Sequence, residues 1–314
     1  MTRVVVRHDR PIADALRARR PDLTVIDTES VEEAVDALGD ADAFAINAGR
    51  WREEYLEPMK SGTWVQATST GYATFPLEAF EEQGIKLTNA HGNYGPPVAD
   101  HTMALTLALA RGVHLSRDSQ LEREWNRRIG DNLIDLEGLT MTIVGLGDIG
   151  ESIAIRAAAF GMNVYGIKRD PSAYDGVLDH DRVLSPPDLQ DMLPETDVLV
   201  LIVPLTDDTR NLVDAAVLAA LPDSAFLINV ARGPVVDTDA LIDALDAGDI
   251  AGAALDVFDE EPLPADSPLW DRRDVLITPH IGGRSKSFVD RYVTLFLKNL
   301  DRLNAGEPLI NRIV

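Results

Sequence analysis

The sequence predicts an α/β protein made of two doubly wound parallel-sheet domains. The chain is 314 residues long, which suits two domains better than one, and 45% of its residues are hydrophobic, enough for two buried cores. Short apolar runs alternate with helix-like stretches, and this alternation occurs twice along the chain. Such a rhythm is typical of βαβ units, in which a helix connects neighbouring parallel strands.

The first alternation spans about residues 1–95. Its apolar runs, such as VVV and LTVI, are short, and the stretches between them have helix-like spacing, as in PIADALRAR. The expected strands lie at 4–6, 23–26, 43–47, 64–68 and 85–89. A long helical stretch over residues 98–125 follows and separates this unit from the next.

The second alternation starts afresh at residue 140. Its apolar runs predict strands at 140–145, 163–167, 197–203, 225–230, 252–258 and 274–278. Residues 288–306 then form one amphipathic stretch, which predicts a closing helix.

The charge balance is strongly acidic. The chain has 52 acidic and 29 basic residues and a net charge of −23, and lysine is rare, at positions 60, 86, 168, 286 and 298 only. The acidic residues are spread along the chain and do not form a tail. A spread acidic surface with little lysine predicts adaptation to high salt, where screening removes most of the self-repulsion. The same charge disfavours nucleic acid as a partner, because polyphosphate needs a basic face.

Several absences narrow the class of protein. The chain contains no cysteine, which excludes disulfides, thiolate catalysis and thiolate metal sites. The six histidines are scattered, so no metal site is expected. No apolar run reaches the ~18 residues of a transmembrane helix, and the apolar stretch near the N-terminus is too short for a signal peptide. We therefore expect a cytoplasmic protein without a membrane partner.

A glycine-rich turn opens the second unit. Gly145, Gly147 and Gly150 form G-x-G-x-x-G between an apolar strand and an apolar-periodic helix, the context that makes this motif a dinucleotide fingerprint. The first glycine permits the tight turn, the second allows a pyrophosphate to approach, and the third allows close packing of helix and strand. Asp148 and Ile149 complete the turn. The pattern predicts a Rossmann-type domain, with the Asp148 carboxylate pointing outward, away from the phosphates.

The end of the next strand indicates which dinucleotide is bound. An NAD site usually has an acidic residue there, about 20 residues after the glycines, to bind the ribose 2′-hydroxyl. This chain has Lys168 and Arg169, which suit a 2′-phosphate, followed by Asp170. The cations favour NADP(H) as cofactor, and Asp170 leaves NAD(H) possible.

Three chemically complementary residues follow strand ends in the second unit. Arg232 follows FLINV, Glu261 follows GAALDVF, and His280 follows DVLIT. Each could have a purely structural role, but together they suit hydride transfer to a 2-keto acid. Arg232 would hold the carboxylate through its bidentate fork, and His280 would give a proton to the keto oxygen. Glu261 would orient the imidazole and favour its protonated form.

The chain resembles the D-isomer-specific 2-hydroxyacid dehydrogenases. The matching segments follow one another over nearly the whole length: GIKLTN, VADHTMALTLALAR, VGLGDIG, VPLTDDTRNLVD, INVARGPVVDTDAL, ALDVFDEEPLP, SPLW and ITPHIGG. The resemblance implies a smaller, flavodoxin-like substrate domain made of residues 1–98 and 285–314, and a dinucleotide-binding domain over residues 99–284. It also implies that Arg232, Glu261 and His280 are the catalytic set and that the product is the D enantiomer.

The resemblance assigns further residues. Thr70, Gly71 and Tyr72 would hold the substrate carboxylate through their backbone N–H groups, and Asp256 would lie near the nicotinamide carboxamide. The family's cofactor-lining turns correspond to Pro204, Thr206, Val230, Ala231 and Gly282. A homodimer formed through the helical region 98–130 is also implied. The segment STGYATFP has one glycine where the family often has G-x-G-x-D, which weakens the transfer of the carboxylate contacts.

Three related readings compete. Formate dehydrogenases commonly have glutamine as the partner of the histidine, and Glu261 argues against them. Phosphoglycerate dehydrogenases often carry an added C-terminal domain, whereas this sequence stops soon after its closing helix. An NAD(H)-sensing corepressor could keep the fold and the same three residues without turnover. The sequence does not identify the 2-keto acid. Its side chain would be bound by loops near 47–51 and 70–75 and by Trp270. Tyr72 and Phe75 could form an apolar wall of that pocket or could equally be core residues.

Overall fold

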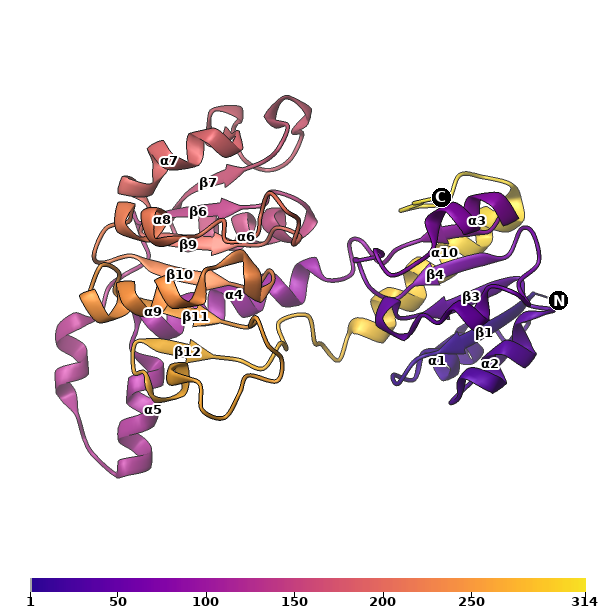
Figure 1. Ribbon diagram of the computed structural model, residues 1–314, viewed down its shortest axis with the longest axis horizontal. Coiled ribbons are helices and arrows are strands. Elements are labelled where there is room, and N and C mark those ends of the chain that lie inside the picture. Colours follow the sequence, from indigo (N-terminus) through magenta and orange to yellow (C-terminus); the bar gives the residue numbers. More distant parts are fainter. Residues whose placement is uncertain (1) are drawn as a thin grey trace. The chain divides into compact units, whose positions relative to one another are not determined.

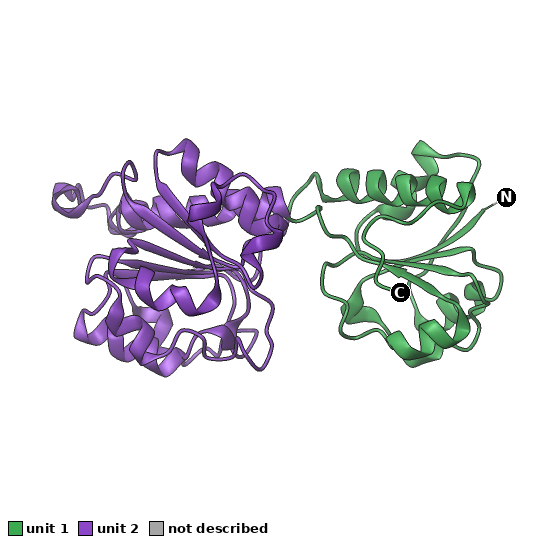
Figure 2. Cartoon of the chain, turned by 90° about the horizontal axis from the view of Figure 1, so that it is seen from above, with its two compact units in different colours: residues 1–94, 285–314 green, residues 95–284 purple. Residues whose placement is uncertain are grey.

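The computed structural model describes residues 2–314. The chain forms two compact units, one made of residues up to 94 together with 285–314 and the other of residues 95–284 (Figure 2). In each unit a parallel sheet lies between layers of helices (Figures 1 and 2), so the predicted fold class is confirmed. The first boundary falls at Gly95 and not at residue 99, because the helix that starts there packs on the second unit along its length.

Unit 1 contains a five-stranded parallel sheet in the order β2-β1-β3-β4-β5. Its strands are β1 (Arg3–Arg7), β2 (Thr24–Asp27), β3 (Ala43–Ile46), β4 (Trp64–Ala67) and β5 (Lys86–Thr88). One face packs on α1 (Ile12–Arg19) and α10 (Phe288–Ala305), the other on α2 (Val31–Leu38) and α3 (Leu77–Gln83). Along β1, Val5 points to the α2 side while Val4 and Val6 point to the α10 side, as the period of a strand requires.

A buried polar network ties the end of the chain to this sheet. Gln66, in the middle of β4, has no exposed surface, and its Oε1 accepts hydrogen bonds from the Thr88 hydroxyl at 2.8 Å and from Asn299 Nδ2 at 3.2 Å. Asn299 also donates to the Ile310 carbonyl and accepts from the Ile310 N–H. Because each buried polar group has a partner, the network holds α10 and the C-terminal segment in one register against β4.

Unit 2 contains a seven-stranded parallel sheet in the order β12-β11-β10-β9-β6-β7-β8. Its strands are β6 (Thr140–Val144), β7 (Asn163–Ile167), β8 (Val183–Leu184), β9 (Val198–Leu201), β10 (Phe226–Asn229), β11 (Gly252–Leu255) and β12 (Val275–Ile277). The chain runs outward from β6 to β8 and then returns to β9 on the other side of β6. The strand order therefore reverses between β6 and β9, the place where such sheets bind ligands at their carboxyl ends.

Helices cover both faces of this sheet (Figure 1). On one face α4 (Gly95–Ala110) packs against α6 (Asp148–Ala159) and against β10 and β11. The other face packs on α7 (Leu189–Met192), α8 (Ala215–Ala220) and α9 (Thr238–Ala247) around one apolar cluster. No helix between residues 2 and 314 combines the length and the apolar character needed to span a membrane.

The helix predicted over residues 98–125 is wrong in its bounds. It begins at Gly95, because Pro96 and Pro97 fall in the first turn, where a missing N–H costs no hydrogen bond. It is broken at Gly112, whose φ of 56° is left-handed and where a Cβ would lie 2.8 Å from the Ile129 side chain. The second part is α5 (Val113–Glu122). The two-residue edge strand β8 was not predicted, since so short a run leaves no pattern.

We expect Asn299→Leu to destabilise unit 1 by about 3 kcal/mol, because the change removes one hydrogen-bond partner from Gln66 Oε1, which is buried, and one from each backbone group of Ile310, which is partly buried. Hydrogen exchange followed by mass spectrometry would show faster exchange in β4 and α10. Asn304→Leu, on an exposed position of the same helix, is the control. Equal protection in the two variants would contradict the role of the network.

Candidate active site

The predicted site residues of unit 2 gather at one edge of its sheet. The glycine turn follows β6, Lys168 follows β7, Arg232 lies after β10, Asp256 follows β11 and His280 lies after β12. All of these strands are parallel, so their carboxyl ends lie at the same edge. The edge thus carries residues from both sides of the point where the strand order reverses.

The geometry of the glycine turn fits a dinucleotide. Gly145 has a φ of 112°, and a Cβ there would lie 2.6 Å from the Ile202 carbonyl oxygen. A Cβ on Gly150 would lie 2.2 Å from the carbonyl oxygen of Gly145, so packing alone requires both glycines. Gly147 is exposed, and no atom lies within 4 Å of the position its Cβ would take. This open position, ahead of the α6 N-terminus, is where a pyrophosphate could approach the backbone.

The place of Asp148 in the turn predicted a carboxylate that points outward, and the structure differs from this prediction. Asp148 is half-buried, and its carboxylate lies against the start of α4, where a Cβ on Gly95 would come within 3.0 Å of it. The partial positive charge at the N-terminus of α4 accounts for this position. Ile149, the next residue, is half-buried in the first turn of α6.

Lys168 reaches back over the glycine turn. Its Nζ donates to the carbonyl oxygen of Leu146 at 3.1 Å, which holds the ammonium group beside the fingerprint. Arg169 is exposed. Asp170 accepts from the N–H and the hydroxyl of Ser172, and the hydroxyl hydrogen bond holds the pKa of Asp170 below its ordinary value. Oδ1 of Asp170, which could have faced a ribose hydroxyl, is thus engaged in capping the next turn.

The turns after β9 and β10 are closed by polar side chains. The Thr209 hydroxyl donates to the Pro204 carbonyl at 2.7 Å and accepts from the Thr206 N–H at 2.8 Å, a contact that sequence reasoning missed. Pro204 and Thr206 are exposed at the edge of the sheet, whereas Val230 and Ala231 are buried. The last two would therefore face a cofactor mainly through their backbone.

Arg232 is exposed, and its loop abuts the loop that leads to Glu261. The Arg232 guanidinium donates from Nη1 to the Ala231 carbonyl at 2.5 Å. Gly233 follows, and a Cβ there would lie 2.0 Å from the carbonyl carbon of Phe258. Only glycine allows the two backbones to approach this closely, so the position of the loop at Phe258 requires a glycine at residue 233, directly after Arg232.

His280 and Glu261 form a hydrogen-bonded pair. His280 Nδ1 lies 2.7 Å from Glu261 Oε2, while Glu261 Oε1 accepts from the Phe258 N–H at 3.1 Å. An ionised carboxylate only accepts, so Nδ1 carries the hydrogen and Nε2 is left to exchange a proton with a ligand. The His280 side chain is 49% exposed, which leaves the ring accessible.

Asp256 is buried and holds the turn that carries His280. Its Oδ1 accepts from the Thr278 hydroxyl at 2.6 Å and the Ile281 N–H at 2.9 Å, and its Oδ2 accepts from the Gly282 N–H at 2.8 Å. Burial alone would raise the pKa of Asp256, but the His101 imidazole, the Thr278 hydroxyl and the two N–H groups outweigh it and hold the pKa below its ordinary value. Asp256 therefore stays ionised.

The space beside Gly282 is filled from within the unit. A Cβ there would lie 2.9 Å from Asp256 Oδ2 and 3.1 Å from His101 Cδ2, so packing explains this glycine, and its contact with a cofactor stays a prediction. His101 was not predicted as a site residue. The available signal was a histidine on a helix whose neighbouring residues are mostly apolar. Within residues 2–314, no three His, Asp or Glu side chains are grouped to hold a metal ion.

Unit 1 presents a turn after β4 that suits an anion. The carbonyl oxygens of Thr70 and Gly71 accept from Asn89 Nδ2 and the Ser69 hydroxyl, each at 2.8 Å. Among residues 2–314, no acceptor pairs with the N–H groups of Thr70, Gly71 and Tyr72. Unpaired N–H groups in a turn are what a carboxylate requires.

A cavity of about 530 Å³ lies close to this turn in unit 1. Residues from both loops expected to bind the substrate side chain, near 47–51 and 70–75, contribute to its wall. The lining residues are Trp51, Arg52, Glu53, Glu54, Thr74, Phe75 and Pro76. Phe75 is only 4% exposed and packs with Trp51 in the core, so its core role is the correct one, while Tyr72 is exposed. Trp270 lies in the other unit, half exposed, with Nε1 donating to the Pro264 carbonyl.

Comparison with known proteins decides the family. The family model described as "D-isomer specific 2-hydroxyacid dehydrogenase, NAD binding domain" matches residues 103–282. The chain belongs to the D-isomer specific 2-hydroxyacid dehydrogenase family. The resemblance seen in the sequence is thus confirmed, and the family consists of NAD(P)-dependent 2-hydroxyacid dehydrogenases.

Known relatives are similar to this protein over almost its whole length. "Glyoxylate/hydroxypyruvate reductase B" of Enterobacter sp. (strain 638) is 37% identical over 299 residues, 91% of this chain and 90% of that protein. A crystal structure of a family protein from Aeromonas salmonicida subsp. salmonicida A449 is 32% identical, with a TM-score of 0.84 over 100% of this chain and 98% of the other. A family structure from Xanthobacter autotrophicus Py2, in complex with NADPH and MES, is 27% identical, with a TM-score of 0.79 and the same coverage.

Proposed function

We propose that this protein reduces a 2-keto acid to the D-2-hydroxy acid, with NADPH preferred to NADH as hydride donor. The observation that carries the proposal is the 2.7 Å pair of His280 and Glu261 at the sheet edge that also holds the glycine turn. The pair supplies a proton donor of fixed tautomer beside a turn suited to a dinucleotide. Unit 2 would bind the cofactor, and unit 1 would contribute the N–H groups of Thr70, Gly71 and Tyr72.

The residues would divide the reaction in a simple way. The bound nicotinamide supplies a hydride to C2 of the keto acid. His280, protonated, gives the hydrogen on Nε2 to the keto oxygen, so that hydride and proton together convert the carbonyl to the hydroxyl group. Glu261 holds Nδ1–H and stabilises the imidazolium before transfer. Arg232, which is exposed, binds the substrate carboxylate through its planar guanidinium.

A small 2-keto acid is the substrate class that the relatives favour. The Enterobacter relative is named for glyoxylate and hydroxypyruvate, both of which carry the carboxylate–carbonyl head that Arg232 and His280 would read. The cavity beside the Thr70–Tyr72 turn, lined by Trp51 and charged side chains, could accept a longer polar side chain. We therefore propose glyoxylate and hydroxypyruvate as first substrates and longer 2-keto acids as secondary ones.

The preference for NADP(H) rests on charge after β7. Lys168 is held over the glycine turn and Arg169 is exposed next to it, while Asp170 Oδ1 is engaged by Ser172. A 2′-phosphate would meet two cations there. The NADPH complex of the Xanthobacter family member is consistent with this choice.

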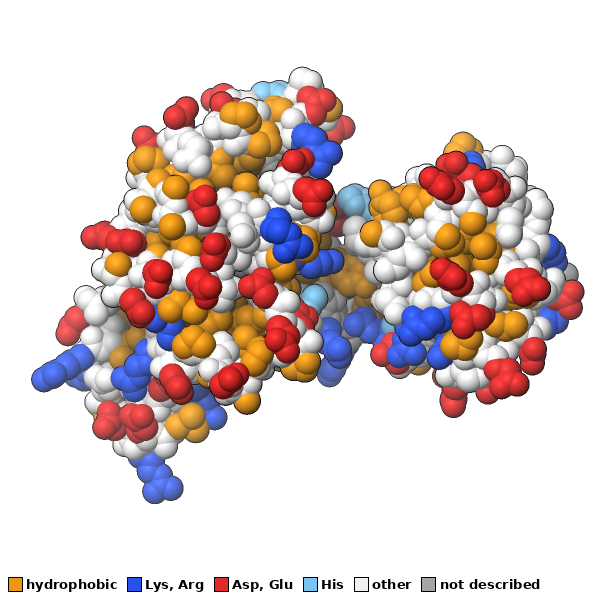
Figure 3. Space-filling model, viewed as in Figure 1, with side chains coloured by type: hydrophobic (Ala, Val, Ile, Leu, Met, Phe, Trp, Pro, Cys, Tyr) orange, Lys and Arg blue, Asp and Glu red, His pale blue; other side chains and the backbone are white. Residues whose placement is uncertain are grey.

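The surface supports a protein that works in high salt. Acidic side chains are scattered over the visible face of each unit (Figure 3), in keeping with the net charge of −23. At molar salt, charges more than ~3 Å apart are largely screened, so this density of like charge costs little there. We propose a cytoplasmic enzyme of a salt-adapted organism.

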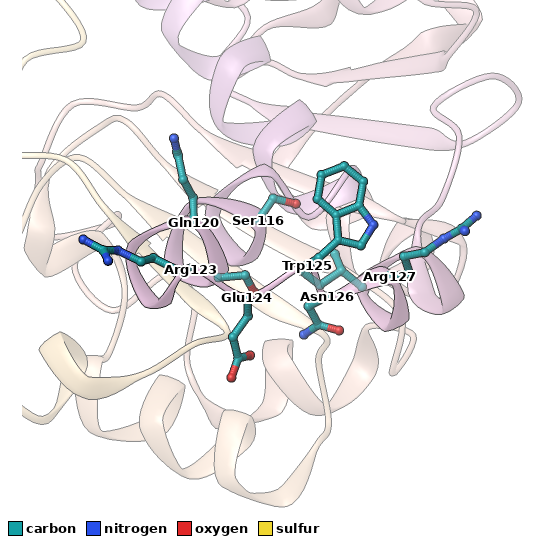
Figure 4. A pocket seen from close by; sticks show the side chains of 9 residues that line it. Ser116, Gln120, Arg123, Glu124, Trp125, Asn126 and Arg127 are labelled. Atoms are coloured by element: carbon teal, nitrogen blue, oxygen red, sulfur yellow. The ribbon is translucent and has the colours of Figure 1, made fainter.

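We also propose a homodimer formed through an arm of unit 2. α5 and the 3-10 helix Arg127–Asn132 extend away from the sheet (Figure 1), and a hollow of about 600 Å³ lies between them. The Trp125 ring stands beside the hollow (Figure 4) and is 92% exposed, and Leu121 is 66% exposed. Apolar side chains this exposed on a projecting arm favour a partner, and a second copy of this arm would offer the same apolar groups in return.

Initial rates with a panel of 2-keto acids, in ~2 M KCl to screen the surface charge, test the function. We expect NADPH-dependent turnover of glyoxylate and hydroxypyruvate, reduced about 10²- to 10⁴-fold by His280→Ala, since the general acid is lost. His114→Ala is the control. Turnover only of a phosphorylated hydroxypyruvate would indicate a phosphoglycerate dehydrogenase-like enzyme. Stoichiometric cofactor binding without turnover of any 2-keto acid would favour a non-enzymatic, NAD(H)-sensing corepressor.

Lys168→Ala should weaken NADPH binding about tenfold more than NADH binding, because one charge-assisted contact with the 2′-phosphate is removed. Fluorescence titration of both nucleotides measures the ratio. Lys298→Ala, on the exposed side of α10, removes the same charge elsewhere and should leave the ratio unchanged. Equal losses for the two nucleotides would mean that Lys168 serves only to hold Leu146.

The double variant Leu121→Asp with Trp125→Asp should be monomeric while the parent protein is dimeric, because the apolar contact would then bury carboxylates without partners. Light scattering coupled to gel filtration in ~2 M KCl gives the mass. Val177→Asp, at an apolar position of unit 2 that is 55% exposed and off the arm, is the control. A monomeric parent protein would rule out the dimer.

A further inference from the structure

A second histidine of unit 2 contacts the turn that carries His280. His101, on α4, places Nε2 3.0 Å from the Thr278 hydroxyl oxygen and 3.4 Å from Asp256 Oδ1. Its side chain is only 18% exposed. Neither the family comparison nor the proposed mechanism gives this histidine a role.

The hydrogen bonds among these groups have only one consistent direction. Thr278 has one hydroxyl hydrogen, and the Asp256 carboxylate 2.6 Å away can only accept, so that hydrogen goes to Asp256. The Thr278 oxygen must then accept from His101, which therefore carries hydrogen on Nε2. The chain of donors runs from His101 through Thr278 to Asp256, and from the backbone N–H groups of Ile281 and Gly282 to the same carboxylate.

The turn needs such support because its backbone is strained. His280 has a φ of 51°, in the left-handed region that residues with a Cβ rarely adopt. A conformation of this kind is energetically unfavourable and persists only where the surroundings determine it. Asp256 supplies that constraint by holding the two N–H groups that follow His280, and His101 with Thr278 keeps Asp256 in place.

The packing around Gly282 shows that His101 reaches the turn directly. A Cβ at Gly282 would lie 3.1 Å from His101 Cδ2, so the ring and the backbone of the turn are in close contact. His101 thus borders the turn by packing as well as by hydrogen bonding.

We propose that His101 is a positioning residue for the reaction: by donating to Thr278 beside Asp256, it fixes the turn of residues 278–282 in the conformation that aims His280. The proposal rests on the proposed role of His280. It assigns a functional reason to a histidine that otherwise only fills space on a helix. His101 does not touch the reacting atoms, and its effect passes through Thr278 and Asp256.

The test compares variants of His101 in the full-length protein, in ~2 M KCl. His101→Leu removes the donor, while His101→Gln keeps an N–H donor at a similar reach. We expect kcat with NADPH and glyoxylate to fall about tenfold or more in His101→Leu, because a displaced general acid loses its alignment, and to be largely retained in His101→Gln. Thr278→Val should reproduce the loss, and the double variant should be no worse than either single one, since both break the same chain.

A matched control is available in the same unit. The His114 ring contacts two backbone carbonyls, those of Ala108 and of Arg273 at the amino end of β12. His114→Leu removes comparable hydrogen bonds without touching the turn at the carboxyl end of that strand. It should change the melting temperature, as His101→Leu does, but leave kcat at ordinary temperature unchanged.

The pH profile gives a readout that packing alone would not move. The His101 contact helps hold the pKa of Asp256 below its ordinary value, and the stabilisation from the ionised carboxylate is lost as the pH falls through that pKa. Without His101 the pKa rises toward the ordinary value. The acid-side loss of activity should therefore begin at a higher pH in His101→Leu than in the parent protein or in His114→Leu.

The outcomes separate the two proposals. If the parent protein turns over no 2-keto acid, the proposed function fails, and the positioning role is then judged by NADPH binding and by the NMR titration of His280, assigned with His280→Gln. An unchanged His280 titration and unchanged NADPH affinity in His101→Leu would overturn the positioning role. If the parent protein is active, a His101→Leu variant with the same kcat as the parent protein would also overturn it. So would a His101→Gln variant as impaired as His101→Leu.

Discussion

The buried carboxylate of Asp256 is the interaction on which the candidate site depends. It lies at the end of β11 and binds the hydroxyl and N–H groups of the neighbouring strand end, so two strands are joined where the chemistry would occur. A charge in this position is stable only because several donors compensate for the lost water. Those same donors belong to the turn of His280. Burial of one carboxylate therefore sets the direction of an imidazole that is itself half exposed.

Much of the site could be predicted because its signals are local. A glycine turn between a strand and a helix, a cation after the next strand, and Arg232, Glu261 and His280 after later strands can each be read from a few neighbouring residues. The parallel order of the sheet then brings them to one edge without further information. The pairing of Glu261 with His280 follows from the adjacency of β11 and β12.

The remainder depends on contacts between distant segments, which leave no local pattern. His101 meets Thr278 across 177 positions of the chain. The break of the predicted long helix at Gly112 depends on Ile129, which packs against that glycine from a later turn. The inward position of Asp148 depends on the N-terminus of α4. In each case the residue type allowed several environments, and the fold selected one.

The Gln66–Asn299 network has a consequence for how the chain is made. Unit 1 needs α10, which is translated after unit 2, to complete one face of its sheet, and Asn299 binds β4 of that sheet. Unit 2 is continuous, and all of its residues leave the ribosome before α10 does. On the nascent chain, unit 2 can fold while unit 1 waits with part of one apolar sheet face uncovered, the reverse of the usual N-terminal-first order of domain folding.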